Sequence, residues 1–117
     1  MDKRSDGIVE LTASNFDKTI EDGVVLVDFY GENCPSCNGQ DIILDSVFES
    51  MSAEVKFAKE VKFTRIEAKK YLSLAGGRFN IKNLPTTIIF KDGVELKRFA
   101  GLIGEEPLII ELNKALK

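Results

Sequence analysis

Hydrophobic residues recur along the chain with two different periods, and segments of each period alternate. Residues 24–30 are apolar at nearly every position, which is typical of a central strand covered on both faces. Residues 61–67 alternate with a period of two and predict another strand, with Phe63 and Arg65 on the same side. A shorter strand is expected over residues 7–11.

Stretches with a helical period separate these strands. Residues 13–20 are expected to form a helix that Thr12 caps. A longer helix should begin near Cys34, because an apolar stripe at helical period follows it: Ile43, Leu44, Val47, Phe48 and Met51. Residues 68–75 predict a short helix that the glycines at 76–77 end.

The last third of the chain predicts a hairpin followed by a helix. Asp92-Gly93 is a strong two-residue turn signal between the strand-like residues 87–91 and 94–99. Acids and a proline at positions 105–107 favour a helix start. The predicted order is therefore βαβαβαββα, an α/β fold with a central mixed β-sheet and helices on both faces.

The length and the net charge limit the kinds of function that this chain is expected to have. The 117 residues fit one domain, in which residues 1–6 are expected to be a flexible extension. A net charge of -3 without blocks of one sign does not suggest nucleic acid or a membrane as a partner. The N-terminus lacks the apolar run of a targeting signal, so a cytoplasmic protein is expected.

The chain has only two cysteines, Cys34 and Cys37, and no histidine. This spacing does not resemble the disulfide framework of a secreted domain, which carries more cysteines at wider spacings. Two thiolates supply half of a tetrahedral metal site, so a metal would need a dimer that shares ligands. We therefore expect a working dithiol, with no metal and no cofactor.

Four motifs resemble those of the thioredoxins, in the same order and at nearly the same spacing. They are LTASNF (11–16), VVLVDFYGENCPSC (24–37), NLPTTIIFKDG (83–93) and AGLIGEE (100–106). The resemblance implies a thioredoxin fold and a monomeric protein-disulfide reductase, with Cys34 as the nucleophile and Cys37 as the resolving thiol. Its implied partners are disulfide-containing client proteins and a thioredoxin reductase linked to NADPH.

The resemblance also implies a client-binding surface around the cysteines. In this family the bond between Leu84 and Pro85 is cis and faces the cysteines, so the Leu84 backbone can pair with an extended client peptide. Gly101 and Leu102 would form an apolar rim beside it. Asn33 stands where the family has a tryptophan.

The order of residues between the cysteines predicts an unusual redox poise. If Cys34 is the N-cap of a helix, Pro35 is at N1, and the N–H groups of Ser36 and Cys37 point at the sulfur. The family's usual Cys-Gly-Pro-Cys places proline at N2 and loses one donor. Retaining both donors should stabilise the Cys34 thiolate and make this couple less reducing than an ordinary thioredoxin's.

Asp28 lies within the apolar run, six residues before Cys34. Burial disfavours the charged form and should raise the pKa of Asp28, so that it can take the proton of Cys37 directly or through a water. The alternative is a structural aspartate satisfied by hydrogen bonds. A lysine that some thioredoxins place near this acid aligns with Phe63 here.

Three other functions remain open at this stage. The proline after Cys34 fits a glutaredoxin-like protein. The absence of tryptophan and the long connection over residues 67–85 resemble thioredoxins that serve amino-acid reductases as specialised electron carriers. A binding module that keeps the fold without turnover is disfavoured by the presence of Asp28 and both cysteines.

Overall fold

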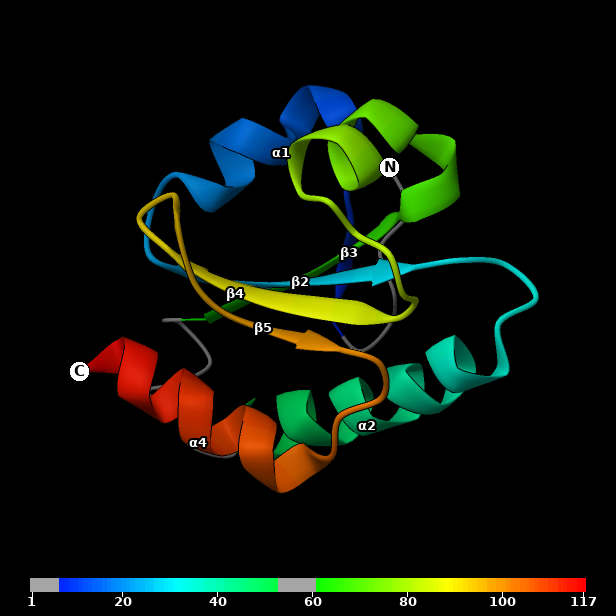
Figure 1. Cartoon of the computed structure of the whole chain (residues 1–117). Coiled ribbons are helices and arrows are strands. Elements are labelled where there is room, and N and C mark those ends of the chain that lie inside the picture. The colour runs from blue at the N-terminus through cyan, green and yellow to red at the C-terminus, as the bar shows by residue number, and fades with distance from the viewer. Residues whose placement is uncertain (1–6, 53–60) are drawn as a thin grey trace.

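A five-stranded sheet lies at the centre of the computed structural model, which describes residues 7–52 and 61–117 (Figure 1). The strand order is β1-β3-β2-β4-β5, and the strands are β1 (Val9–Glu10), β2 (Val24–Tyr30), β3 (Val61–Glu67), β4 (Thr86–Lys91) and β5 (Val94–Ala100). β3 runs parallel to β1 and β2, whereas β4 is antiparallel to β2 and β5. The predicted α/β fold with a central mixed sheet is confirmed.

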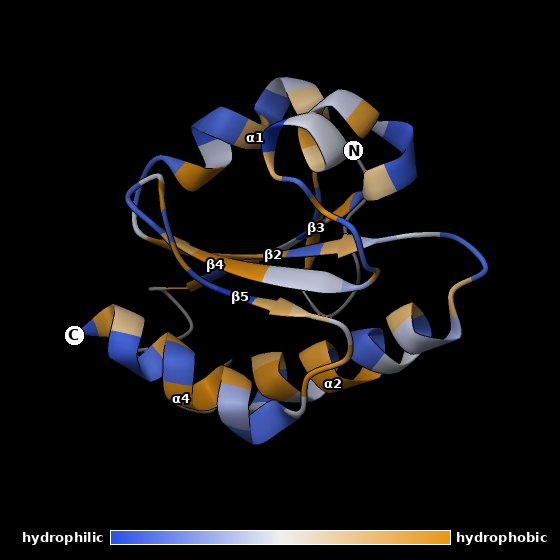
Figure 2. Cartoon of the chain, viewed as in Figure 1, coloured by the Kyte–Doolittle hydropathy of each residue, from blue (hydrophilic) through white to orange (hydrophobic). Residues whose placement is uncertain are grey.

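Helices cover both faces of this sheet (Figure 1). α2 (Pro35–Ser52) and α4 (Glu105–Leu116) pack on one face, and α1 (Ala13–Ile20) and the turn η2 (Ser73–Arg78) pack on the other. Each face of the sheet has its own hydrophobic core, and alternate residues of β2 belong to the two cores. Val24 and Leu26 face α2, whereas Val25 and Val27 face α1. Figure 2 shows the apolar colouring of β2 and part of β4 between the two helical layers.

The bounds of α1, β2 and β3 match the sequence prediction, and Asn15 Oδ1 accepts a hydrogen bond from the Thr12 N–H at the start of α1 (2.8 Å). Asp92 and Gly93 form the predicted turn, and both have positive φ values (50° and 84°), as a type I′ turn requires. The strand expected over residues 7–11 is shorter than predicted, because β1 pairs with β3 only at two positions. The extension predicted for residues 1–6 lies outside the described residues.

The prediction of a regular helix over residues 68–75 is wrong. A 3₁₀ turn, η1 (Ala68–Lys70), precedes the π-helical turn η2, in which the Phe79 N–H donates to the Leu74 carbonyl (3.0 Å). The glycines at 76–77 lie inside η2 and do not end it. Leu72, an apolar residue of the expected stripe, directly precedes η2 and is 67% exposed.

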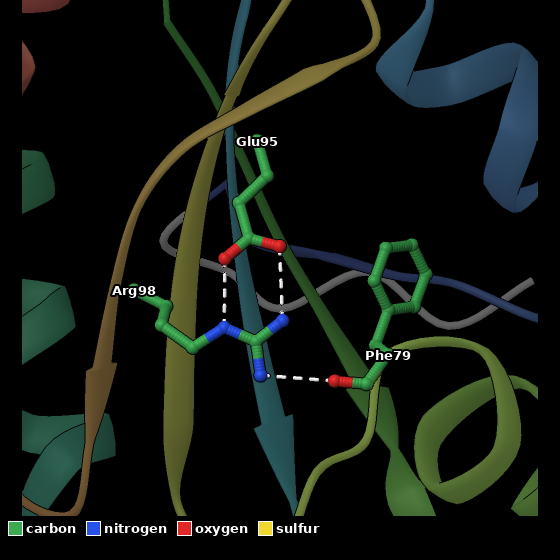
Figure 3. A network of polar contacts seen from close by, with 3 residues as sticks. All are labelled: Phe79, Glu95 and Arg98. Atoms are coloured by element: carbon green, nitrogen blue, oxygen red, sulfur yellow. Dashed lines mark hydrogen bonds and ion pairs between the residues drawn. The ribbon is translucent and has the colours of Figure 1, made fainter.

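A bulge in β5 ties this strand to the end of η2. Phe90 pairs with Glu95 and Ile89 with Lys97, so one extra residue lies between these pairs. Glu95 and Arg98 consequently reach the same face of the sheet. Arg98 donates two hydrogen bonds to the Glu95 carboxylate (2.7 and 2.9 Å) and one to the Phe79 carbonyl (2.9 Å), as Figure 3 shows.

Candidate active site

Cys34 and Cys37 form a disulfide at the start of α2, with their Cα atoms 5.2 Å apart. Cys34 precedes the first helical residue and is partly exposed, whereas Cys37 lies in the first turn and is only 4% exposed. A client disulfide can therefore approach the first sulfur but not the second.

The helix start provides donors to the Cys34 sulfur. The Cys37 N–H donates to Cys34 Sγ (3.1 Å), as expected of an N-cap, and Pro35 is the first residue of α2 as predicted. The Ser36 N–H does not make the second expected bond. Ser36 instead brings its hydroxyl oxygen to 3.7 Å from Cys34 Sγ.

Asp28 lies beneath this helix start. It is 1% exposed, and it shares the sheet face of Leu26, which packs in the same core as Leu44 of α2. Cys37 is on the buried side of α2, seven residues before Leu44 and therefore close to the same helical face. The structure thus brings the buried acid and the buried cysteine to the same region between β2 and α2.

Two polar residues that sequence reasoning missed are the strand neighbours of Asp28. Arg65 of β3 and Thr87 of β4 lie directly opposite it in register. Phe63 lies opposite Leu26, and Arg65 is the residue of β3 that lies opposite Asp28. The period-two pattern placed Arg65 on the correct side, but only the strand register puts it next to Asp28.

Arg65 holds together a charged cluster beside the site. Its guanidinium forms ion pairs with Glu10 (3.2 Å) and Asp41 (3.6 Å), and it stacks 3.9 Å from the centre of the Tyr30 ring. The Tyr30 hydroxyl donates to Glu10 (2.7 Å). Burial and this hydrogen bond raise the pKa of Tyr30 well above its ordinary value, so Tyr30 acts as a donor and not as a base at neutral pH.

The loop before β4 reaches the cysteines. The Leu84–Pro85 peptide bond is cis, as the family resemblance implied. The Leu84 carbonyl oxygen lies 3.5 Å from Ser36 Oγ and 3.9 Å from Cys34 Sγ. The backbone group expected to meet a client is thus adjacent to the exposed sulfur.

The loop after β5 lies beside the same segment. Gly101, with a φ of 89°, donates its N–H to the Pro85 carbonyl (2.7 Å). Leu102 is 54% exposed, and Asn33 is an exposed residue with positive φ just before Cys34. Gln40, a buried residue of α2 that sequence reasoning missed, contacts this loop; its signal was a polar residue on the apolar side of the helix.

Within the described residues there is no helix that is long and apolar enough to cross a membrane. In the same residues no three His, Cys, Asp or Glu side chains are grouped so that they would hold a metal ion.

Comparison with known families supports the interpretation of these motifs. The family model described as "Thioredoxin" matches residues 7–114. The chain belongs to the thioredoxin family. This match and the Cys34–Cys37 disulfide identify it as a thiol–disulfide oxidoreductase.

Curated thioredoxins are similar to this chain along most of its length. It is 37% identical over 108 residues to thioredoxin Y, chloroplastic, of Oryza sativa subsp. japonica, a match that covers 91% of this chain but 60% of the rice protein. It is 34% identical to the thioredoxin of Chlamydia caviae, covering 89% of this chain and 94% of that protein.

Solved structures show the same thioredoxin fold. A mutant thioredoxin from Halobacterium salinarum NRC-1 superposes with a TM-score of 0.79 at 19% identity, covering 100% of this chain and 97% of the other. The thioredoxin of Malassezia sympodialis superposes with a TM-score of 0.74 at 18% identity, covering 100% and 96%.

Proposed function

We propose that this protein reduces disulfides of client proteins by two successive exchanges. The Cys34 thiolate attacks a client sulfur, the client S–S bond breaks, and one client thiolate leaves. Cys37 then loses its proton and attacks Cys34 Sγ, which releases the second client sulfur. The client gains two electrons and two protons, and the protein is left with the Cys34–Cys37 disulfide.

The observation that carries this proposal is the disulfide between a partly exposed and a buried cysteine at a helix start. The greater exposure of Cys34 supports its role as the nucleophile, and the hydrogen bond from the Cys37 N–H favours negative charge on the Cys34 sulfur (3.1 Å). Pro35 and Ser36 are placed to tune the pair, because Pro35 is the first residue of α2 and the Ser36 hydroxyl lies 3.7 Å from Cys34 Sγ.

In this proposal Asp28 is the proton acceptor for Cys37. A buried thiol resists ionising, and the buried acid lies on the facing strand beneath it. Burial disfavours a carboxylate, which makes an aspartate a better acceptor near neutral pH. Arg65 is paired with Glu10 and Asp41, which offsets its positive charge beside Asp28.

The client would bind across two loops that meet next to Cys34. The Leu84 backbone offers hydrogen-bonding groups to an extended peptide, with Pro85 behind it. Gly101 and Leu102 supply an apolar contact, and Asn33 borders the site from the other side.

The test is reduction of insulin, with NADPH and thioredoxin reductase as the electron source. We expect turnover that Cys34→Ser abolishes, together with a redox potential less negative than an ordinary thioredoxin's. Activity with glutathione as sole reductant would replace this proposal with a glutaredoxin-like function. Absence of insulin reduction by the fully reduced protein would indicate a specialised carrier or a binding module.

We also propose a cellular location, an oligomeric state and a reductase for this protein. A cytoplasmic monomer is the expectation from sequence, and the relatives include bacterial thioredoxins as well as chloroplastic ones. The reductase that restores the dithiol is expected to be an NADPH-linked thioredoxin reductase.

A further inference from the structure

Gln40 is a fully buried amide in α2, three residues after Cys37. It lies on the inner side of the helix, where Leu44 and Val47 are apolar. Removing an amide from water is unfavourable unless its hydrogen bonds are replaced. The hydrogen-bond partners of the Gln40 amide therefore indicate the role of this residue.

Both polar groups of the Gln40 side chain bind one residue of another segment. Gln40 Nε2 donates to the Ile103 carbonyl (2.9 Å), and the Ile103 N–H donates to Gln40 Oε1 (2.8 Å). Ile103 lies between the end of β5 and the start of α4, beyond the strand ladder. The amide thus pairs with the Ile103 backbone as a neighbouring strand would, and two bonds fix both its position and its orientation.

The other end of this short loop is attached to the opposite side of the active site. The Gly101 N–H donates to the Pro85 carbonyl (2.7 Å). Leu102 is therefore held between two anchors, one on the loop before β4 and one on the helix that carries the cysteines. A Cβ atom at position 39 would lie 3.6 Å from Leu102 Cδ1, so the Leu102 side chain lies over Gly39 in the first turns of α2 while staying half exposed.

We propose that Gln40 is a positioning residue that sets the place of Leu102 against α2 and thereby determines how well polypeptide clients bind. The inference rests on the proposed function, because it requires that Leu102 contacts the client. Gln40 does not touch the reacting sulfurs. Its loss should therefore affect a polypeptide disulfide more than a small one, which needs no contact with the loop.

The test compares Gln40→Leu, Leu102→Ala and the double variant as fully reduced proteins. The readout is the rate constant for reduction of insulin disulfides divided by the rate constant for reduction of 5,5′-dithiobis(2-nitrobenzoate). We expect this ratio to fall about 5- to 10-fold in Gln40→Leu, and to fall less than about twofold further when Gln40→Leu is added to Leu102→Ala. The redox potential of the cysteine pair should not change.

A matched control is Ser50→Ala, which removes a hydrogen bond between α2 and Glu105 of α4 (3.0 Å) without touching the 101–103 loop. Its ratio should equal that of the parent. If Gln40→Leu does not fold, Gln40→Met removes the same two bonds with a longer, more adaptable side chain.

The possible outcomes distinguish failure of the positioning role from failure of the proposed client surface. An unchanged ratio in Gln40→Leu, or equal losses in both backgrounds, would overturn the positioning role. An unchanged ratio in Leu102→Ala would instead overturn the client surface of the proposed function. A lower ratio in Ser50→Ala would mean that general loosening of α2 is responsible and would also overturn the inference.

Discussion

Cys34 and Cys37 stand one helical turn apart and have different surroundings, because α2 begins between them. Cys34 is the capping residue and keeps part of its surface in solvent, whereas Cys37 faces the sheet. The helix N-terminus and the Cys37 N–H favour negative charge on the first sulfur. In the proposed mechanism the second sulfur needs a separate proton acceptor.

Replacing Asp28 with Asn should separate the two exchange steps. We expect the resolving attack by Cys37 to slow at least about 100-fold, because general base catalysis contributes on that scale, while the first attack changes little. Stopped-flow single turnovers with the reduced protein measure both rates. The control is Thr87→Val, which changes the other polar neighbour on β4 and keeps the acid; equal rates for Asp28→Asn and the parent would exclude the acceptor role.

Ser36 has two donors beside Cys34: its hydroxyl, which is close to the sulfur in the disulfide, and its N–H, which does not bond to the sulfur there and is expected to bond only to the reduced thiolate. Ser36→Pro removes both, and Ser36→Ala removes only the hydroxyl, which lies 3.7 Å from the sulfur. A neutral hydrogen bond is worth about 0.5–1.5 kcal/mol, so each lost donor should make the couple more reducing by about 10–30 mV and raise the pKa of the Cys34 thiol. Equilibrium with glutathione measures the potential, and no change in either variant would refute the donor argument.

At the scale of elements, the β5 bulge decides which side chains meet. In a regular strand Glu95 and Arg98, three residues apart, would point to opposite faces. The extra residue between them turns both toward η2, where Arg98 also binds the Phe79 carbonyl (Figure 3). This contact anchors the segment that leads from η2 to Pro85.

Glu95→Gln should lower stability in a pH-dependent way. The hydrogen bonds from Arg98 hold the pKa of the Glu95 carboxyl below its usual range, so the pair stabilises the fold above the unfolded pKa of about 4.3. That contribution is lost as pH falls through the lower folded value. Because the pair is about one-third exposed, the expected loss at pH 7 is about 0.5–1 kcal/mol, shrinking toward zero in acid.

Urea unfolding at pH 7 and at about pH 3 measures this difference. Glu111→Gln is a suitable control, because its contact with Lys114 is longer (3.5 Å) and spans a single helix. An equal loss at both pH values would contradict the electrostatic explanation.

At the scale of the whole molecule, the sheet separates the core beneath the helix that carries the cysteines from a second core on the opposite face. The face away from the cysteines contains an aromatic cluster in which Phe16 lies 5.4 Å from Phe79 and about as close to Phe29 and Phe90 (6.1 and 6.0 Å). All these rings contact across elements that are distant in sequence. The core that contains this cluster also packs against Leu84, but it lies on the face of the sheet opposite α2 and the cysteines.

Phe16→Ala should therefore destabilise the protein without changing its chemistry. We expect the free energy of unfolding to fall by about 3–5 kcal/mol, since a large buried ring leaves a cavity. The potential of the cysteine pair should stay at the parent value. Exposed Ile42 provides the control, as Ile42→Ala should cost no more than about 0.5 kcal/mol; a shifted potential in Phe16→Ala would show that the two cores are coupled.

Much of this architecture follows from local sequence patterns. The periods of two and 3.6 residues, the Asp92-Gly93 turn and the Thr12 cap each act over a few residues, and they placed α1, β2, β3 and the hairpin correctly. The segment from Ala68 to Arg78 was misjudged because its apolar spacing fits a regular helix, whereas the chain forms a wider π turn there.

The sequence by itself determined the order of the elements, the dithiol at a helix start and the acid in the preceding strand. Only the tertiary structure decided that Arg65 and Thr87 border Asp28, and that Gln40 binds a residue 63 positions away. The physical reason is that periodicity and turn chemistry depend on near neighbours along the chain. Strand register and the contacts between a helix and a loop depend on the packing of the whole sheet.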